Sequence, residues 1–191
     1  MALSLPIDPA ANDLLNRDPL ALLVGMTLDQ QIPLEKAFTS PYVLTQRLGH
    51  EPDARELAEH DPEALITVFA TPPALHRFPK AMATRVQEVC RVLVDRYDGD
   101  PAGLWTGVTD GRELLARIAD LPGFGRQKAQ IFLALLGKRY GVTPPGWREA
   151  AGGYGDPDAY RSVADIVDGE SLRQVREYKK QAKAEAKAAR G

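Results

Sequence analysis

Apolar residues along the chain recur at the three- and four-residue spacing of helices that bury one face. After Asp18, for example, Leu20, Leu23 and Val24 fall on the same side of a helix. No stretch alternates apolar and polar residues in the way a half-buried strand does. The pattern therefore predicts an all-α protein, with helices over residues 9–16, 19–30, 33–39, 41–48, 53–59, 62–70, 79–97, 110–119, 126–139, 157–166 and 170–189.

Six Asp-Pro and Ser-Pro pairs mark the expected helix starts. The Asp or Ser side chain accepts a hydrogen bond from a free N–H group of the first turn. Proline loses nothing at the first helical position, because its missing N–H group had no partner there. We expect a helix cap at each of Asp8-Pro9, Asp18-Pro19, Ser40-Pro41, Asp61-Pro62, Asp100-Pro101 and Asp156-Pro157.

The charge of the chain is unevenly distributed. The 191 residues carry a net charge of −2, and 44% of them are hydrophobic, which is enough to build a core. Residues 173–190 hold seven Lys or Arg against two acids, and the remainder holds 17 basic and 24 acidic residues. The slightly acidic total therefore hides a basic C-terminal helix, which either binds phosphates or is a solvated tail.

Cysteine and histidine usage excludes several kinds of site. The single cysteine, Cys90, cannot build a disulfide framework or a multi-cysteine metal cluster, and the three histidines lack a metal-ligand spacing. We expect Cys90 to be buried and His76 to be an exposed loop residue. No apolar run has the roughly 18 residues of a membrane span, and no basic region precedes a signal-like segment at the N-terminus. These features predict a monomeric cytoplasmic protein without a metal site.

The most informative segment is the connection Leu121-Pro122-Gly123-Phe124-Gly125 between two amphipathic stretches, which cover residues 112–139. Pro122 ends the first helix, while Gly123 and Gly125 allow a positive φ or a close backbone approach. Leu121 and Phe124 can anchor the turn in the core. We expect a helical hairpin.

The second helix of this hairpin begins with features that suit an anion. Its first N–H groups have no helical partner, and they lie at the positive end of the helix dipole. Arg126 and Lys128 add positive charge, and residues 121–139 contain no acid. The sequence therefore predicts a phosphate site here.

This string, continued by Arg126-Gln127-Lys128-Ala129, resembles the helix-hairpin-helix motif of the HhH-GPD superfamily of base-excision DNA glycosylases. In that superfamily the hairpin amides hold a DNA phosphate beside the lesion. The resemblance implies a double-stranded DNA partner and removal of a damaged or mismatched base by base flipping. It also implies the DNA-binding residues Leu121, Gly123, Gly125, Arg126, Gln127 and Lys128.

Residues 18–31 resemble the early apolar helix of these enzymes, which ends in a glutamine pair. The resemblance gives Gln31 the role of filling the gap left by the flipped base, and the alternative is an ordinary core helix with a polar end. The family has two interlocked helical subdomains. Here the central one would span residues 21–139, and residues 1–20 plus 140–191 would form the other, with DNA across the cleft.

The sequence departs from the family at two positions. Members that also cleave the strand carry a nucleophilic lysine where this chain has Gln127. Lys128 is rotated from that position by roughly 100° about the helix axis, so we expect a monofunctional glycosylase without lyase activity, and Lys128 to contact phosphate or solvent. The four-cysteine cluster of some members is excluded. No cofactor is expected, although a monovalent cation at the hairpin is compatible with the resemblance.

The second departure concerns the carboxylate that stabilises positive charge on the sugar when an N-glycosidic bond breaks. Most active members carry an Asp about eighteen residues past the lysine position, where this chain has none. Asp156, Asp158 and Glu149 are the nearest candidates, and Asp156 also suits a helix cap. If none serves, the protein is a non-catalytic binder of damaged or distorted DNA. A helical protein without DNA affinity is the third hypothesis.

Residues 141–155 form the longest expected loop and are rich in Gly and Pro. A loop of that length in a compact chain is often functional. Trp147, Tyr154 and Tyr160 in and beside it can stack on a flipped base, or they can anchor the loop to the core.

Overall fold

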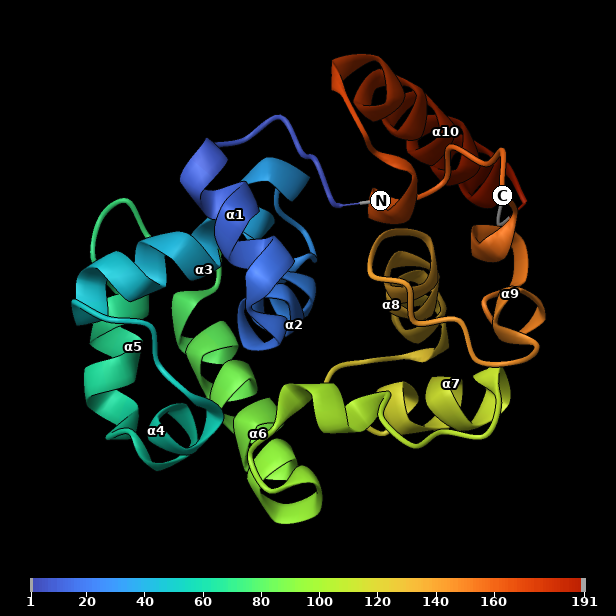
Figure 1. Ribbon diagram of the computed structural model, residues 1–191. Helices are drawn as coiled ribbons and strands as arrows, with labels where there is room; N and C mark the ends of the chain where they lie inside the picture. Colours follow the sequence, from blue (N-terminus) through green and yellow to red (C-terminus); the bar gives the residue numbers. More distant parts are fainter. Residues whose placement is uncertain (1, 190–191) are drawn as a thin grey trace.

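A computed structural model describes residues 2–189 of the chain, and none of these residues lies in a β-strand. The expected all-α class is therefore confirmed. Figure 1 shows the α-helices α1 (Pro9–Arg17), α2 (Pro19–Leu28), α3 (Leu34–Leu48), α4 (Ala54–Glu59), α5 (Pro62–Ala70), α6 (Pro79–Tyr97), α7 (Gly111–Ala119), α8 (Arg126–Arg139), α9 (Trp147–Ala150) and α10 (Gly169–Ala188). Three short 3₁₀ helices join them, η1 (Pro101–Leu104), η2 (Gly152–Gly155) and η3 (Val163–Asp165).

The helices gather into two groups in space. In Figure 1, α1 to α6 lie on one side and α7 to α10 on the other. α6 packs against α4 and α5, whereas α8 packs against α7, α9 and η3. Long-range hydrogen bonds join the groups, among them those from Lys128 Nζ to Thr27 O and from Tyr140 Oη to Leu15 O, each 3.0 Å. The expected domain boundaries, 21–139 and 1–20 plus 140–191, stay a prediction.

Helix α2 forms the centre of the first group, and every residue from 20 to 28 is buried. It packs against α1, α3, α6 and η1. Gly25 makes room for the ring of Phe38, because a Cβ atom at this position would lie 2.9 Å from Phe38 Cδ1. A helix that is apolar on all sides needs such partners all round it.

Four of the six expected caps are confirmed. The side chains of Asp8, Asp18, Asp61 and Asp100 each accept a hydrogen bond from a backbone N–H group two or three residues later. The expected cap at Asp156 is wrong, because no helix follows it. Asp156 instead pairs with Arg161, at 3.3 Å.

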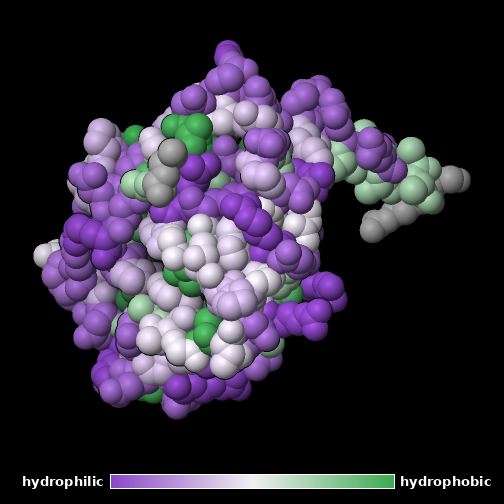
Figure 2. All heavy atoms as spheres, turned by 45° about the vertical axis from the view of Figure 1, so that its right-hand side comes forward, coloured by the Kyte–Doolittle hydropathy of each residue, from purple (hydrophilic) through white to green (hydrophobic). Residues whose placement is uncertain are grey.

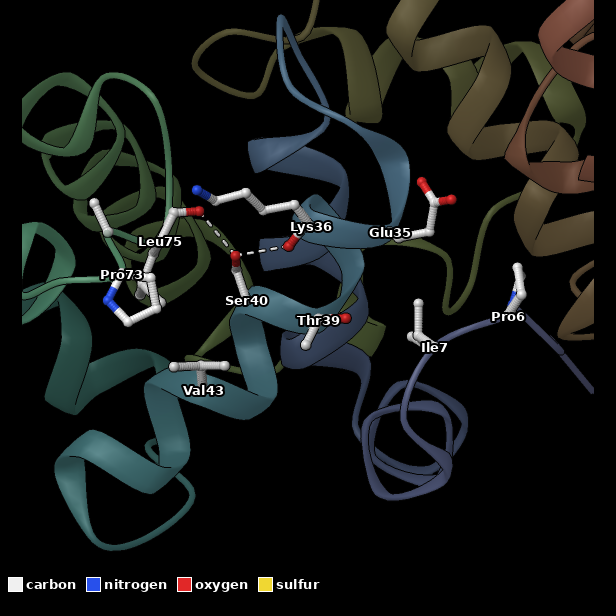
Figure 3. A pocket seen from close by; sticks show the side chains of 10 residues that line it. Pro6, Ile7, Glu35, Lys36, Thr39, Ser40, Val43, Pro73 and Leu75 are labelled. Carbon is white, nitrogen blue, oxygen red and sulfur yellow. Dashed lines mark hydrogen bonds between the residues drawn. The ribbon is translucent and has the colours of Figure 1, made fainter.

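The expected helix start at Ser40 is also wrong, because α3 runs unbroken through Pro41 and replaces the two helices predicted over 33–39 and 41–48. Figure 3 shows the reason: Ser40 Oγ lies 2.7 Å from Lys36 O, one turn back, and 2.8 Å from Leu75 O. The hydroxyl therefore serves α3 and its neighbour, so it does not cap a new helix.

The segment after α8 differs from the expectation in two ways. The expected loop over 141–155 contains α9 and η2, and the expected helix over 157–166 is reduced to η3. Trp147 accounts for the first difference, because its buried indole ring packs against α8 and its backbone abuts Gly111 of α7. Asp165 accounts for part of the second, because its carboxylate accepts the N–H groups of Arg161 and Ser162 and closes a short capped turn.

A buried ion pair fastens this segment to α8. Lys138 Nζ lies 2.5 Å from Asp165 Oδ1, and the two side chains are 9% and 3% exposed. Lys138 also donates to the backbone oxygen of Asp156. Since the carboxylate has two backbone donors besides the ammonium group, its burial is compensated.

The buried residues of helix α10 lie in its first two turns. Ser171, Leu172 and Val175 are buried, and Arg176 pairs with Glu35 of α3. The rest of the helix projects from the body in Figure 2 and exposes its lysines. Arg190, one of the seven basic residues of the C-terminal stretch, lies outside the described residues.

Candidate functional site

The residues between α7 and α8 form a tight turn. Leu121 and Phe124 are buried, which confirms them as anchors, and Phe124 N donates to Leu121 O at 3.0 Å. Gly123 has a φ of +80°, a conformation that favours glycine. Gly125 is the N-cap of α8 in an extended conformation, and no side chain caps the helix.

The start of α8 offers donors to an anion. Its first turn contains no acidic residue, and Arg126 and Gln127 are exposed there. Backbone N–H groups at an uncapped helix start bind phosphate oxygens well, because they point outward at the positive end of the dipole. Gln127 Nε2 donates to Tyr154 Oη at 2.8 Å, which joins the hairpin to the following loop.

Arg85 of α6 lies directly against the turn. A Cβ atom added to Gly123 would lie 2.2 Å from Arg85 Nη1, so the glycine leaves room for the guanidinium group at this place. Arg85 Nε is 3.1 Å from Glu88 Oε2. The turn thus brings a second cation beside Arg126, a contact that the sequence pattern did not reveal.

An open hollow of about 660 Å³ continues this basic surface along the start of α6. Three cations, Arg77, Lys80 and Arg85, and one acid, Glu88, line it. Phe78 also lines it, with a ring that is 42% exposed and lies 5.3 Å from the Arg77 guanidinium carbon. A cationic surface with an exposed aromatic ring suits a nucleic-acid backbone and its bases.

Lys128 points from α8 towards α2. Its ammonium group donates to Thr27 O and lies 5.3 Å from the centre of the Phe124 ring. Burial lowers the pKa of Lys128 to about 8, although the nearby carboxylate of Asp29 opposes the shift. Lys128 and Gln127 therefore have different neighbours, as the rotation of one residue predicts.

Asp29, which the sequence analysis did not single out, lies at the same junction as the residue that ends α2. It is partly buried, and within residues 2–189 its carboxylate has no hydrogen-bond donor and no ion-pair partner. Desolvation raises the pKa of Asp29, and the charges of Lys179 and Lys128 only oppose that shift. The signal in the sequence was an acid placed directly after a helix that is apolar on all sides.

His76 holds the turn that follows Asp29. Phe78 N donates to His76 Nδ1 at 3.0 Å, so the ring hydrogen is on Nε2, which donates to Gln30 O at 2.9 Å. The expectation of an exposed loop residue is wrong, because this ring is buried between α2 and α6. Gln31 follows, exposed and in a left-handed conformation with a φ of 57°.

We expect His76 to make stability dependent on pH. Burial lowers the pKa of His76 below the ordinary histidine value of about 6.5, so the unfolded chain binds a proton more readily than the folded protein. The stabilising contribution is therefore present above pH 6.5 and is lost as the pH falls, by at most about 1.4 kcal/mol per pH unit. Urea unfolding from pH 5 to 8 should show a shallower dependence in His76→Gln than in the original protein, and equal slopes would contradict this assignment.

None of the three carboxylates predicted from the sequence contacts the hairpin turn within the described residues. Asp156, Asp158 and Glu149 are exposed, and Asp156 is paired with Arg161. Asp158 lines a separate hollow of about 350 Å³ with Tyr160 and Lys138. Asp29 is a better candidate for a chemical role than these three carboxylates, because it is the one that lies beside Lys128.

The aromatic residues of the loop differ in role. Trp147 anchors the loop, because its ring packs where a Cβ atom at Gly137 would lie 2.4 Å away. Tyr154 accepts the hydrogen bond from Gln127. Tyr160 is 46% exposed. Cys90 is buried as expected, and burial raises the pKa of its thiol to about 12.

Other features of the described chain point to no second site. A hollow of about 430 Å³ beside α3 has mostly apolar walls, and Figure 3 shows Ser40 in it already bonded to the backbone. Residues 2–189 contain no group of three or more His, Cys, Asp or Glu side chains arranged for a metal. A cation at the hairpin would have only backbone carbonyl oxygens as ligands, since the turn carries no acid. Within the same residues, no helix combines the length and hydrophobicity required to cross a bilayer.

Comparison with protein-family models, with curated proteins and with solved structures finds no match for this chain.

Proposed function

We propose that the protein binds double-stranded DNA and removes a damaged or mismatched base as a monofunctional N-glycosylase of the HhH-GPD kind. The observation that carries the proposal is the hairpin. Its turn is anchored by Leu121 and Phe124, and it presents the uncapped start of α8 beside two cations, Arg126 and Arg85.

In this proposal the amides of α8 hold a phosphate next to the target nucleotide, and the cations add charge. Gln31, exposed on the turn after α2, fills the gap in the duplex once the base is flipped out. Lys128 joins α2 to α8, so it fixes the position of this turn relative to the hairpin. The two-subdomain arrangement of the family, with DNA across the cleft, is part of the same proposal.

The DNA-binding part of the proposal predicts a change in salt dependence. We expect Arg126→Ala to weaken binding to a duplex by about 1.5 kcal/mol, which is about tenfold in Kd. It should also reduce the slope of log K against log salt by about 0.9, the value for one phosphate contact. Fluorescence anisotropy between 50 and 200 mM salt measures both.

Arg112→Ala is the matched control, because Arg112 is exposed at the far end of α7 from the turn. The control should bind like the original protein. An unchanged slope in Arg126→Ala, or no binding of the original protein at low salt, contradicts the proposed interface.

The enzymatic part is tested by base release from duplexes with uracil, thymine mismatches, alkylated purines or oxidised bases. We expect release of at least one base and no covalent adduct with abasic DNA after borohydride reduction. The second candidate function is a non-catalytic binder of damaged DNA. It is favoured because, within residues 2–189, no side chain of Glu149, Asp156 or Asp158 contacts the turn at residues 121–125. Tight binding without release from any duplex identifies this function.

A further inference from the structure

We propose that Asp29 is a catalytic residue, whose carboxylic acid donates a proton to the departing base as the N-glycosidic bond breaks. The inference rests on the proposed glycosylase function and assigns a residue outside the three carboxylates expected from the sequence. It also defines the class of substrate, namely bases that leave as neutral molecules only when they gain a proton.

The position of Asp29 carries the inference. It follows α2 directly and lies two residues before Gln31. The turn that contains it is held by the hydrogen bond from His76 Nε2 to Gln30 O. Lys128 reaches the same place from α8, and Lys179 acts on Asp29 from α10. The carboxyl group therefore lies where the two groups of helices meet, and it is partly open to solvent.

Asp29 is an unfavourable residue for stability at this place. A negative charge at a helix C-terminus is repelled by the negative end of the helix dipole. Its carboxylate accepts no hydrogen bond from residues 2–189 and is partly buried, so the charge loses part of its hydration without a protein donor in exchange. Residues that lower stability in this way often serve a function, because they contribute nothing to the stability of the fold.

Burial of Asp29 favours the protonated form of its carboxyl group. Burial raises the pKa of Asp29, so the acid form persists at higher pH than for an exposed aspartate. The facing charges are Lys128 of α8 and Lys179 of α10, and Arg85 of α6 acts on Lys128. These cations stabilise the carboxylate that forms once the proton has moved.

The reaction balances with water as the co-reactant. The bond between the sugar C1′ and the base nitrogen breaks, and both electrons go to the nitrogen, which takes the proton of Asp29. For a neutral base, the carboxylate that this transfer leaves lies beside the positively charged sugar and stabilises it. A base that already carries a positive charge takes no proton, so Asp29 stays neutral during its release. Water forms a bond to C1′ and gives its proton to the carboxylate, which restores the acid and leaves an abasic sugar and the free base.

The experiment compares two leaving groups in single-turnover base release. Uracil and hypoxanthine need a proton to leave as neutral bases, whereas 7-methylguanine already carries a positive charge in the duplex. We expect Asp29→Asn to slow release of whichever neutral base the protein accepts by about 100-fold or more. Release of 7-methylguanine, and binding of each duplex, should change by less than about threefold.

Asp95→Asn is the matched control, since Asp95 is exposed on α6. Urea unfolding confirms that Asp29→Asn folds. Because the pKa of Asp29 is raised in the folded state, its stabilising contribution is lost as the pH rises, so the variant should gain stability relative to the original protein between pH 4 and pH 8.

Three results overturn the inference. Equal release of a neutral base by Asp29→Asn and the original protein shows that Asp29 is not the acid, and so does an equal loss for neutral and cationic bases. A loss of release in Glu149→Gln, Asp156→Asn or Asp158→Asn, with Asp29→Asn active, assigns the role elsewhere. If the original protein releases no base at all, the proposed function fails, and the inference fails with it.

Discussion

Replacement of Trp147 by alanine is expected to cost about 3–5 kcal/mol of the free energy of unfolding. The indole ring is buried against α8 where Gly137 leaves room for it, and the backbone of the same residue abuts Gly111 of α7. Gly111 N also donates to Pro145 O at 2.8 Å. The ring therefore holds α9 on α8, beside the hydrogen bond from Gln130 Nε2 to Ala150 O. Its loss leaves a large cavity.

Urea unfolding followed by circular dichroism measures this effect. Tyr160→Ala is a suitable control, because it removes an aromatic ring that is largely exposed and should change stability by less than about 0.5 kcal/mol. A cost below about 1 kcal/mol for Trp147→Ala would show that the loop does not depend on this ring.

The second large effect is expected at the buried ion pair. Lys138→Met leaves the carboxylate of Asp165, which is 3% exposed, without its cation, and should cost about 3–5 kcal/mol. The double variant Lys138→Met, Asp165→Asn removes the unpaired charge and keeps an oxygen for the N–H groups of Arg161 and Ser162. We therefore expect it to be more stable than the single variant.

The same denaturation experiment includes Arg173→Ala, which removes an exposed ion pair with Glu170. Such pairs contribute little, so this control should stay within about 1 kcal/mol of the original protein. The hypothesis fails if Lys138→Met is no more destabilising than Arg173→Ala.

Local sequence signals predicted the helices well where local forces decide them. The Asp-Pro pairs at Asp8, Asp18 and Asp61 begin helices, because a cap needs only its own first turn. The same signal fails at Asp156, where the chain is held by Lys138 and Arg161. It also fails at Ser40, whose hydroxyl bonds to Leu75, 35 residues away. Contacts of this kind have no signature in a short window.

The candidate site shows the same limit. The hairpin anchors Leu121 and Phe124 were predictable, because turn residues and buried neighbours lie within five positions. The roles of Asp29, His76 and Arg85 were not predictable, since each depends on a contact with a residue far away in the sequence. Only the folded chain brings them to one junction.

The all-apolar character of α2 has a consequence for synthesis of the protein. The packing partners of this helix include α6 and η1, which ends at Leu104, so α2 leaves the ribosome long before these two exist. At about 5–20 residues per second, residues 29–104 take about 4–15 s to make. During that interval an apolar segment is exposed to solvent. The nascent chain is then at its greatest risk of aggregation and has its greatest need of a chaperone.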